Sequence, residues 1–396
     1  MNMVAAFQTV HEQSGNNRSR IERVDVLRSM ADGEPIWRAM EAASPLATRY
    51  QAFELLNAWQ TTVGHHEGTS PFIVVAYDTH NRPVLLLPLA VSRRNGVRVA
   101  RFMGGKHCSF NMPIWQCAFA ASATKDDVET IIDAIRREAD GIDILALTQQ
   151  PKRWRGVPNP LAQLAGQPSP DPVPSMTIMP NAKPEDRIRS STRRRLRNKE
   201  RKLSTLPGYR YFMAETDADI HRLLDAFFIL KPLRMALSKL PNVFGDDTTK
   251  KFIRDACTSK LSNGRRAVEL HALECDDEVI SLFSCVADGR RFSTMFNTYT
   301  TSQNAQYSPG LILLREMIDR YSDLGYIEYD FGVGASEYKI MFCKEDEPVI
   351  DSFVPLTARG TLAALGMSSL TLAKRLVKHS STLTKMAHVL RNVLRR

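Results

Sequence analysis

The chain has 396 residues, a formal net charge of +10 and an apolar content of 43%. This length allows two domains of ordinary size, and the composition is that of a globular protein rather than a disordered or fibrous one. The longest apolar runs, at 72–77 and 84–91, are too short to cross a bilayer as helices. The positive charge favours anionic partners such as nucleotide cofactors, nucleic acid or an acidic membrane surface, without choosing among them.

The first fifty residues indicate the compartment of the protein, and the cysteines indicate whether it binds a metal. The first fifty residues lack the apolar segment of a secretory signal, so we expect a cytoplasmic protein. The six cysteines are scattered, with no CxxC pair and no histidine at metal-ligand spacing. Free cysteines most often behave as small buried hydrophobic residues. We therefore expect no metal cofactor and no catalytic cysteine.

The N-terminal half predicts one disordered segment and one globular unit. Residues 1–20 are polar and offer little to bury, so we expect them to be disordered. The unit spans residues 21–150. Within it the sequence predicts helices at 45–64 and 126–139 and strands at 72–78, 83–92, 97–103 and 142–147. The first three strands are joined by the short polar turns THNR and RRNG, which are typical of antiparallel hairpins.

Residues 151–184 separate two parts of the chain. This segment contains nine prolines in 34 residues. Such a density excludes regular helix and predicts a linker or an extended crossover. An apolar strand at 173–179 is still compatible with the composition. We place the boundary between the two units in this segment.

The second unit, residues 185–357, opens with a strongly basic segment. Residues 187–202 hold nine Lys and Arg side chains against one Glu and predict a helix. Further along, the sequence predicts helices at 217–230, 247–262 and 310–324 and strands at 267–274, 278–287, 290–298 and 326–331. Residues 358–396 form a basic amphipathic tail with eight Lys and Arg side chains and no Asp or Glu.

The order of predicted elements occurs twice. Three strands, a helix and a strand follow one another at 72–147 and again at 267–331. The two segments share the pattern and not the residues, and we interpret them as two copies of one unit. The turns between consecutive strands are too short for parallel crossovers. The predicted fold class is therefore α/β (α+β), with two tandem units whose mixed, largely antiparallel sheets are flanked by helices.

The first candidate site is the start of the helix predicted at 310–324. Ser308 suits the N-cap and Pro309 the first helical position, where its missing N–H costs nothing. The N–H groups of Gly310, Leu311 and Ile312 would then lack partners within the helix and could hold a pyrophosphate. The alternative is a plain helix start, because Ser-Pro is common there.

The second candidate site follows the last predicted strand. Asp330 lies at the end of this strand, where a carboxylate can act as a general base or orient an amine. Tyr338 could return a proton, and Lys339 could neutralise a phosphate or a carboxylate. In the alternative interpretation, Asp330 caps the turn at Gly332 and Lys339 is a surface charge.

The run QYSPGLILLREMIDRYSDLGYIEYDFGVGASEYKIMFC at 306–343 resembles the closing segment of the BioF2-like (CelD/BcsL-type) acetyltransferase domain. That family belongs to the acyl-CoA N-acyltransferases related to GNAT enzymes. The same run is similar to Fem-type peptidoglycan aminoacyltransferases, which carry a comparable DFG turn followed by Lys and Phe. The resemblance covers 185–357 well and 50–147 more weakly. It implies two GNAT-like units side by side.

The resemblance also implies roles for residues in both candidate sites. Residues 308–311 would lie where GNAT-like folds hold the pyrophosphate of acetyl-CoA or another acyl-CoA. The usual GNAT signature has more glycines and an Arg or Gln in this loop, so the phosphate contact would differ here. Asp330 and Lys339 match positions shared with the Fem-like group. Asp330 as base is an inference from its place on the strand.

Two basic segments have open interpretations. The helix at 187–202 either forms a solvated face or attracts an anionic donor or a tRNA acceptor end beside the cleft. It lacks aromatic side chains for stacking on bases, so sequence-specific binding of nucleic acid is not indicated. The tail at 358–396 either docks on its own domain or lies on an acidic membrane at the inner face.

These observations lead to one expected function and two alternatives. We expect an acyltransferase that moves an acyl group from acyl-CoA to an amine, such as an amino sugar in exopolysaccharide or cell-envelope synthesis, by direct attack on the thioester. Asp330, Tyr338 and Lys339 are the expected catalytic residues, and Ser308 to Ile312 the expected donor site. The alternatives are Fem-like transfer from aminoacyl-tRNA and a non-catalytic accessory protein of polysaccharide assembly.

Overall fold

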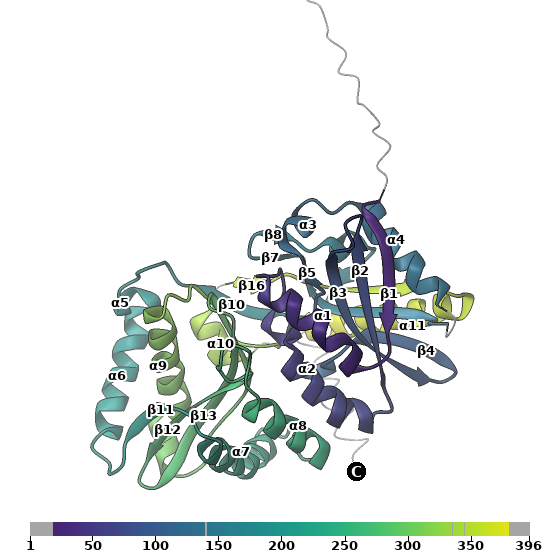
Figure 1. The fold of residues 1–396 in the computed structure, drawn as a ribbon. Helices are drawn as coiled ribbons and strands as arrows, with labels where there is room; N and C mark the ends of the chain where they lie inside the picture. Colours follow the sequence, from purple (N-terminus) through teal and green to yellow (C-terminus); the bar gives the residue numbers. More distant parts are fainter. Residues whose placement is uncertain (1–18, 139–140, 335, 344, 380–396) are drawn as a thin grey trace, which may run out of the picture.

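Two β-sheets with flanking helices make up the chain (Figure 1). The computed structural model describes residues 19–138, 141–334, 336–343 and 345–379. The first sheet has the order β1-β2-β3-β4-β6-β17-β9, with β5 paired to β3. Its strands are β1 (Ile21–Leu27), β2 (Ser70–Asp78), β3 (Pro83–Arg94), β4 (Val97–Phe102), β5 (Ile114–Trp115), β6 (Ile144–Pro151), β9 (Gln167–Pro168) and β17 (Val349–Pro355).

The second sheet has the order β11-β12-β13-β14-β15-β10-β16. Its strands are β10 (Val173–Thr177), β11 (Arg210–Met213), β12 (Glu269–Cys275), β13 (Glu278–Ala287), β14 (Arg291–Tyr299), β15 (Glu328–Asp330) and β16 (Glu345–Glu347). A separate small hairpin is formed by β7 (Arg153–Trp154) and β8 (Val157–Pro158).

The two sheets repeat one topology, as the sequence predicts. In the first, β2, β3 and β4 pair antiparallel, and β4 then pairs parallel with β6. In the second, β12, β13 and β14 pair antiparallel, and β14 then pairs parallel with β15. The parallel pairs are bridged by α4 (Lys125–Arg137) and by α9 (Pro309–Asp323). The predicted class of mixed, largely antiparallel sheets with flanking helices is confirmed.

The two sheets exchange strands across the predicted boundary. β10 comes from the proline-rich segment and pairs with β15 and β16 in the second sheet. β17 lies within the segment 185–357 but pairs with β6 and β9 in the first sheet. The chain therefore crosses between the units twice. Hydrophobic patterning identifies a strand but not its partner, so the exchange has no signature in the sequence.

Helices cover both sheets, and most predicted helices are present within a few residues of their expected bounds. Besides α4 and α9, the α-helices are α1 (Met30–Ala42), α2 (Phe53–Trp59), α3 (Cys117–Ala121), α5 (Pro184–Arg187), α6 (Ser190–Leu203), α7 (Asp217–Leu237), α8 (Asp247–Thr258), α10 (Glu337–Phe342) and α11 (Ala358–His379). The elements that were not predicted include helices α1, α3 and α10 and strands β1, β5, β11, β16 and β17. The helix predicted at 45–64 begins only at Phe53, since a short 3-10 turn at Arg49–Gln51 precedes it.

The units meet in a shared hydrophobic core. One cluster of buried side chains includes Trp59 and Phe110 of the first unit and Phe227 and Phe252 of the second. The hydroxyl of Tyr50 donates a hydrogen bond to the carbonyl oxygen of Thr294 on β14 at 3.4 Å. Helices α2 and α8 also contact each other. A continuous apolar core resists opening, because separating the units would expose it to water.

The close packing of α11 on the first sheet gives a test of this arrangement. A methyl group added at Gly360 would lie 1.7 Å from the carbonyl oxygen of Asp143, while the same group at Gly366 meets nothing within 4 Å. We expect Gly360→Ala to lower the free energy of unfolding by about 2 kcal/mol or more through displacement of the helix. Gly366→Ala should leave it unchanged or raise it by up to about 1 kcal/mol. Urea unfolding of both variants measures the difference, and equal values would contradict the packing.

Candidate functional site

Helix α9 begins with a residue in an unusual backbone conformation. Ser308 has φ 58° and ψ 53°, in the left-handed region that is uncommon for residues other than glycine. Pro309 occupies the first helical position, as predicted. The Ser308 hydroxyl does not cap the helix but accepts a hydrogen bond from the ammonium group of Lys199 at 2.7 Å. Lys199 also donates to the carbonyl oxygen of Gln306 at 3.0 Å. The start of α9 is thus joined to the basic helix α6.

The predicted set of free N–H groups is smaller than expected. The N–H groups of Leu311 and Ile312 both bond to the carbonyl oxygen of Ser308, at 3.0 and 3.2 Å. The carbonyl of an N-cap residue ordinarily accepts the first bond of its helix, and here it accepts two. Ile312 is also buried in the core. Any phosphate contact through the backbone therefore centres on Gly310.

A second cation reaches the same place from α7. A methyl group at Gly310 would lie 3.5 Å from the ring of Tyr299, so this ring covers the start of α9. The guanidinium group of Arg234 stacks on that ring, 3.6 Å from its centroid, and donates a hydrogen bond to its hydroxyl. Lys199 and Arg234 therefore bring positive charge to α9 from two helices. Lys199 belongs to the basic helix predicted at 187–202, whereas Arg234 was not among the predicted site residues.

Strand β14 carries three half-buried side chains at alternate positions, Met295, Asn297 and Tyr299, which we call the β14 row. Alternate residues of a strand share one face. The parallel ladder between β14 and β15 ends at Ser293 and Asp330, so the row lies on the part of β14 that β15 does not flank. The row begins beside α9 at Tyr299.

The middle of the β14 row is surrounded by polar groups. The Lys231 ammonium group donates a hydrogen bond to the carbonyl oxygen of Asn297 at 2.8 Å. The side-chain amide of Asn297 donates to the hydroxyl of Tyr338 at 3.2 Å. Burial, aided by the charge of Arg234, lowers the pKa of Lys231 to about 8. A titratable amine and a phenol thus both contact Asn297, the amine at the backbone carbonyl and the phenol at the side-chain amide.

The far end of the row opens into a cavity of about 300 Å³ between the two units. Its lining is mostly apolar and comes from Lys106, His107, Ser109, Val243, Phe244, Phe252, Ile253, Ala256, Cys257, Val268, Met295, Phe296 and Val333. The residues at 106–109 belong to the first unit, so both units shape the cavity. Burial and the charge of Lys106 lower the pKa of His107 to about 4 and keep its ring neutral near pH 7.

Asp330 and Lys339 lie beneath the turn that follows β15. Asp330 is completely buried, accepts a hydrogen bond from the Ser293 hydroxyl and another from the Gly332 N–H at 3.2 Å. Burial raises its pKa to about 6, against the opposing charge of Arg291. Lys339 is buried as well and is not a surface charge. Both side chains therefore contact the turn rather than an open surface.

The ammonium group of Lys339 donates to three consecutive carbonyl groups of this turn. Its distances to the oxygens of Gly332, Val333 and Gly334 are 2.8, 3.1 and 2.9 Å. Gly332 has φ 75°, and a methyl group there would lie 2.8 Å from the carbonyl oxygen of Thr294. Asp330 binds the turn from one side and Lys339 from the other. Of the predicted catalytic residues, only Tyr338 contacts the β14 row.

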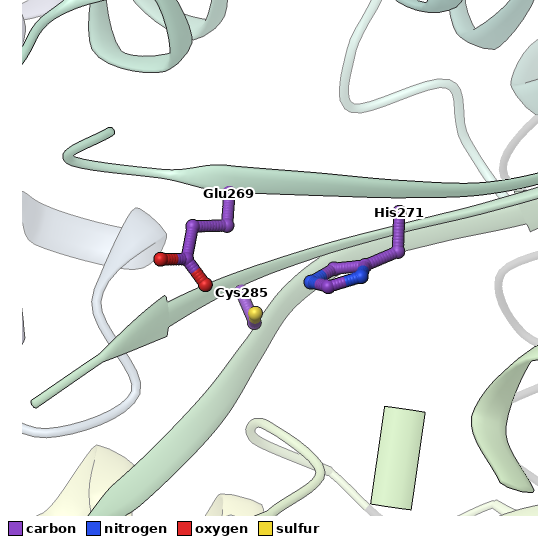
Figure 2. A group of neighbouring side chains, drawn as sticks. All are labelled: Glu269, His271 and Cys285. Atoms are coloured by element: carbon purple, nitrogen blue, oxygen red, sulfur yellow. The ribbon is translucent and has the colours of Figure 1, made fainter. Parts of the chain in front are cut away.

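A buried polar cluster anchors the other end of α9 (Figure 2). Glu269 and His271 on β12 and Cys285 on β13 are the one group of His, Cys and acidic side chains in the described residues whose spacing suits a metal ion. Strand pairing brings them together, which spacing along the sequence does not reveal. The hydroxyl of Tyr321, on α9, lies 2.9 Å from Nε2 of His271 and 3.0 Å from the Cys285 sulfur, and it donates to Glu269.

This cluster is fully satisfied by hydrogen bonds. The second ring nitrogen of His271 lies 2.9 Å from the Tyr211 hydroxyl. Burial lowers the pKa of His271 to about 3 and raises that of Cys285 well above its usual range, so the ring and the thiol are neutral. We therefore interpret the cluster as a hydrogen-bond network that holds α9 on the sheet.

Comparison with protein families identifies the second unit. Residues 190–340 match the family model of the acetyltransferase (GNAT) domain. This segment contains α6, α7, α9, the β14 row and the turn after β15. This part of the chain is therefore similar to acetyltransferase domains of the GNAT type. No curated protein sequence matches the chain significantly.

Solved structures with the same fold span nearly the whole chain. FemX is 9% identical, with a TM-score of 0.59 over 86% of this chain and 99% of FemX. A conserved protein from Bacteroides thetaiotaomicron is 12% identical, with a TM-score of 0.52 over 84% of this chain and 100% of that protein. The C-terminal domain of a protein described as a lysylphosphatidylglycerol synthetase, from Agrobacterium fabrum, is 11% identical, with a TM-score of 0.51 over 86% and 98%. The resemblance to GNAT-like and Fem-like proteins is confirmed at the level of the fold.

The burial of Asp330 predicts a dependence of stability on pH. Its pKa is about 6 in the folded chain and about 4 when unfolded, so the folded state binds the proton more tightly. Protonation of Asp330 therefore adds up to about 3 kcal/mol to the free energy of unfolding. This gain is complete below pH 4 and is lost as the pH rises through 6. In Asp330→Asn this loss should disappear, which urea unfolding at pH 4.5 and pH 8 would measure.

A matched control for this prediction is Asp247→Asn. The side chain of Asp247 is 97% exposed, so the same substitution there should leave the pH dependence of unfolding as in the unchanged protein. Equal pH dependence in the unchanged protein and in Asp330→Asn would contradict the assignment of a proton to Asp330 in the folded state.

Proposed function

We propose that the chain transfers an acyl group from acyl-CoA to an amine along the β14 row. The observation that carries this proposal is the order of groups on one strand face. Tyr299 lies at the cationic start of α9, Asn297 lies between a lysine and a tyrosine, and Met295 opens into the cavity between the units. Alternate residues of a strand are about 7 Å apart, so the row spans about 14 Å.

The donor's phosphates would bind at the start of α9. Lys199 and Arg234 supply positive charge there, and Gly310 allows close approach of the backbone. Ser308 would contribute through Lys199, whose ammonium group it holds. The donor site expected at Ser308 to Ile312 thus gains the side chains of Lys199 and Arg234. Of its expected backbone N–H contacts, the proposal keeps only that of Gly310.

The chemistry would take place at Asn297. The neutral amine attacks the thioester carbon, the C–N bond forms, the C–S bond breaks, and the sulfur leaves as a thiolate. Lys231 in its neutral form accepts the proton lost by the amine, and the Tyr338 hydroxyl gives a proton to the thiolate. Asp330 and Lys339 act as positioning residues, because they fix the turn next to Tyr338. No covalent enzyme intermediate is needed.

The acceptor would enter from the cavity between the units. Its lining is mostly apolar, which favours an amine that also carries an apolar group. The sequence resemblance favours an amino sugar of exopolysaccharide or cell-envelope synthesis as the acceptor class. The proposed donor, acyl-CoA, is the same for either kind of acceptor, so donor binding can be tested first.

One observation favours a second candidate, transfer from an aminoacyl-tRNA. Helix α6 carries several exposed arginines, including Arg194, Arg197 and Arg201, beside the start of α9. A polyanion larger than CoA could follow this face. Binding of tRNA that weakens steeply with salt, together with no binding of CoA, would favour this candidate.

Donor binding can be tested by titration calorimetry with acetyl-CoA. We expect saturable binding that Lys199→Ala and Arg234→Ala each weaken about tenfold, since each removes one charged contact to phosphate. The control is Arg201→Ala, which removes an exposed cation from the same basic helix. Absence of binding, or an equal loss in all three variants, would refute the assignment of the phosphate site.

The role of Lys231 predicts a specific pH profile. Release of the CoA thiol from acetyl-CoA, with glucosamine and an alkylamine as acceptors, should rise with pH around a midpoint of about 8, because only neutral Lys231 accepts a proton. Lys231→Met should lower the rate at least 100-fold. Lys251→Met, at an exposed lysine of α8, is the control. A Lys231→Met protein with an unchanged rate would remove Lys231 from the mechanism.

A further inference from the structure

Helix α11 packs on the first sheet through its small residues. Gly360, Ala364 and Thr371 are buried on the face that contacts β17, β6 and β4. Gly360 lies so close to Asp143 that even a methyl group would clash. The helix thus begins directly on the sheet at Gly360, and Met367 packs further along against buried side chains of β4 and β6.

The leucines of α11 point the other way. Leu362, Leu365, Leu370, Leu372 and Leu376 are between 46% and 74% exposed. Four of them, at 362, 365, 372 and 376, follow helical spacing and form a stripe on the outer face. A surface helix normally turns such a stripe toward the core. In α11 the pattern is inverted, and a stripe of exposed leucines is typical of a docking surface.

The charges beside this stripe are positive. Arg359 and Lys374 are exposed on α11, and Lys378 is paired with Asp171. From Ala358 to the end of the chain there are eight Lys and Arg residues and no Asp or Glu. Four of these lie at 380–396, outside the described residues. A second copy of the chain would bring like charges together, so self-association through this face is disfavoured.

We propose that the outer face of α11 docks on an anionic lipid bilayer. The leucine stripe would enter the boundary between headgroups and acyl chains, and the basic side chains would contact anionic headgroups. In the part of the chain that the structure describes, no helix is long and apolar enough to cross a membrane. The attachment is therefore peripheral, and it is independent of the transfer reaction proposed for the second unit.

Vesicle flotation of the full chain tests this proposal. We expect binding to vesicles of phosphatidylcholine with 30% phosphatidylglycerol at least tenfold stronger than binding to phosphatidylcholine alone, and weaker binding at high salt. The double variant L365S/L376S should lose at least tenfold in binding to the anionic vesicles. Both side chains are exposed, at 62% and 66%, so the fold should be retained.

The matched control is the double variant L237S/L324S. These two leucines are 68% and 60% exposed but lie on α7 and at the end of α9. This variant should bind anionic vesicles like the unchanged protein. Equal loss in both variants, no preference for anionic vesicles, or a dimer that L365S/L376S converts to monomer would each overturn the proposal.

Discussion

The divergence of β14 from β15 is the constraint on which the candidate site depends. The two strands pair only as far as Ser293 and Asp330, and the chain then turns at Gly332. This turn lies against the carbonyl oxygen of Thr294 and leaves no room for a side chain. Buried ionisable groups on both sides hold it in place. Because the turn is fixed, the rest of β14 is not flanked by β15, and α7 packs beside its half-buried alternate side chains.

The individual helices and strands were largely predictable from the sequence, because they depend on neighbouring residues. The alternation of apolar and polar residues identified the three strands that precede α9, and the Ser-Pro-Gly start located this helix to within one residue. The exchange of β10 and β17 was not predictable, because the partner of a strand is chosen by the whole sheet. The same holds for Glu269, His271 and Cys285, which meet only through strand pairing.

The location of the candidate site was predictable from the sequence, but most of the side chains that line it were not. Tyr338 was found from the sequence, and it contacts Asn297. Lys231 and Arg234 were not found, because they look like ordinary charges of a surface helix until α7 packs over β14. Asp330 was predicted as a base because a carboxylate stands at the end of a strand. In the structure it is buried and accepts a hydrogen bond from the backbone of the turn. Only packing separates these possibilities.

A second, larger cavity lies close to the one at the end of the β14 row. This cavity of about 850 Å³ lies between the first sheet and α11, whose residues from Ala363 to Lys374 form one wall. Lys106 and Val333 line both this cavity and the smaller one at the end of the β14 row. Because strand β17 leads directly into α11, the strand exchange between the two units also joins the proposed docking helix to the first sheet.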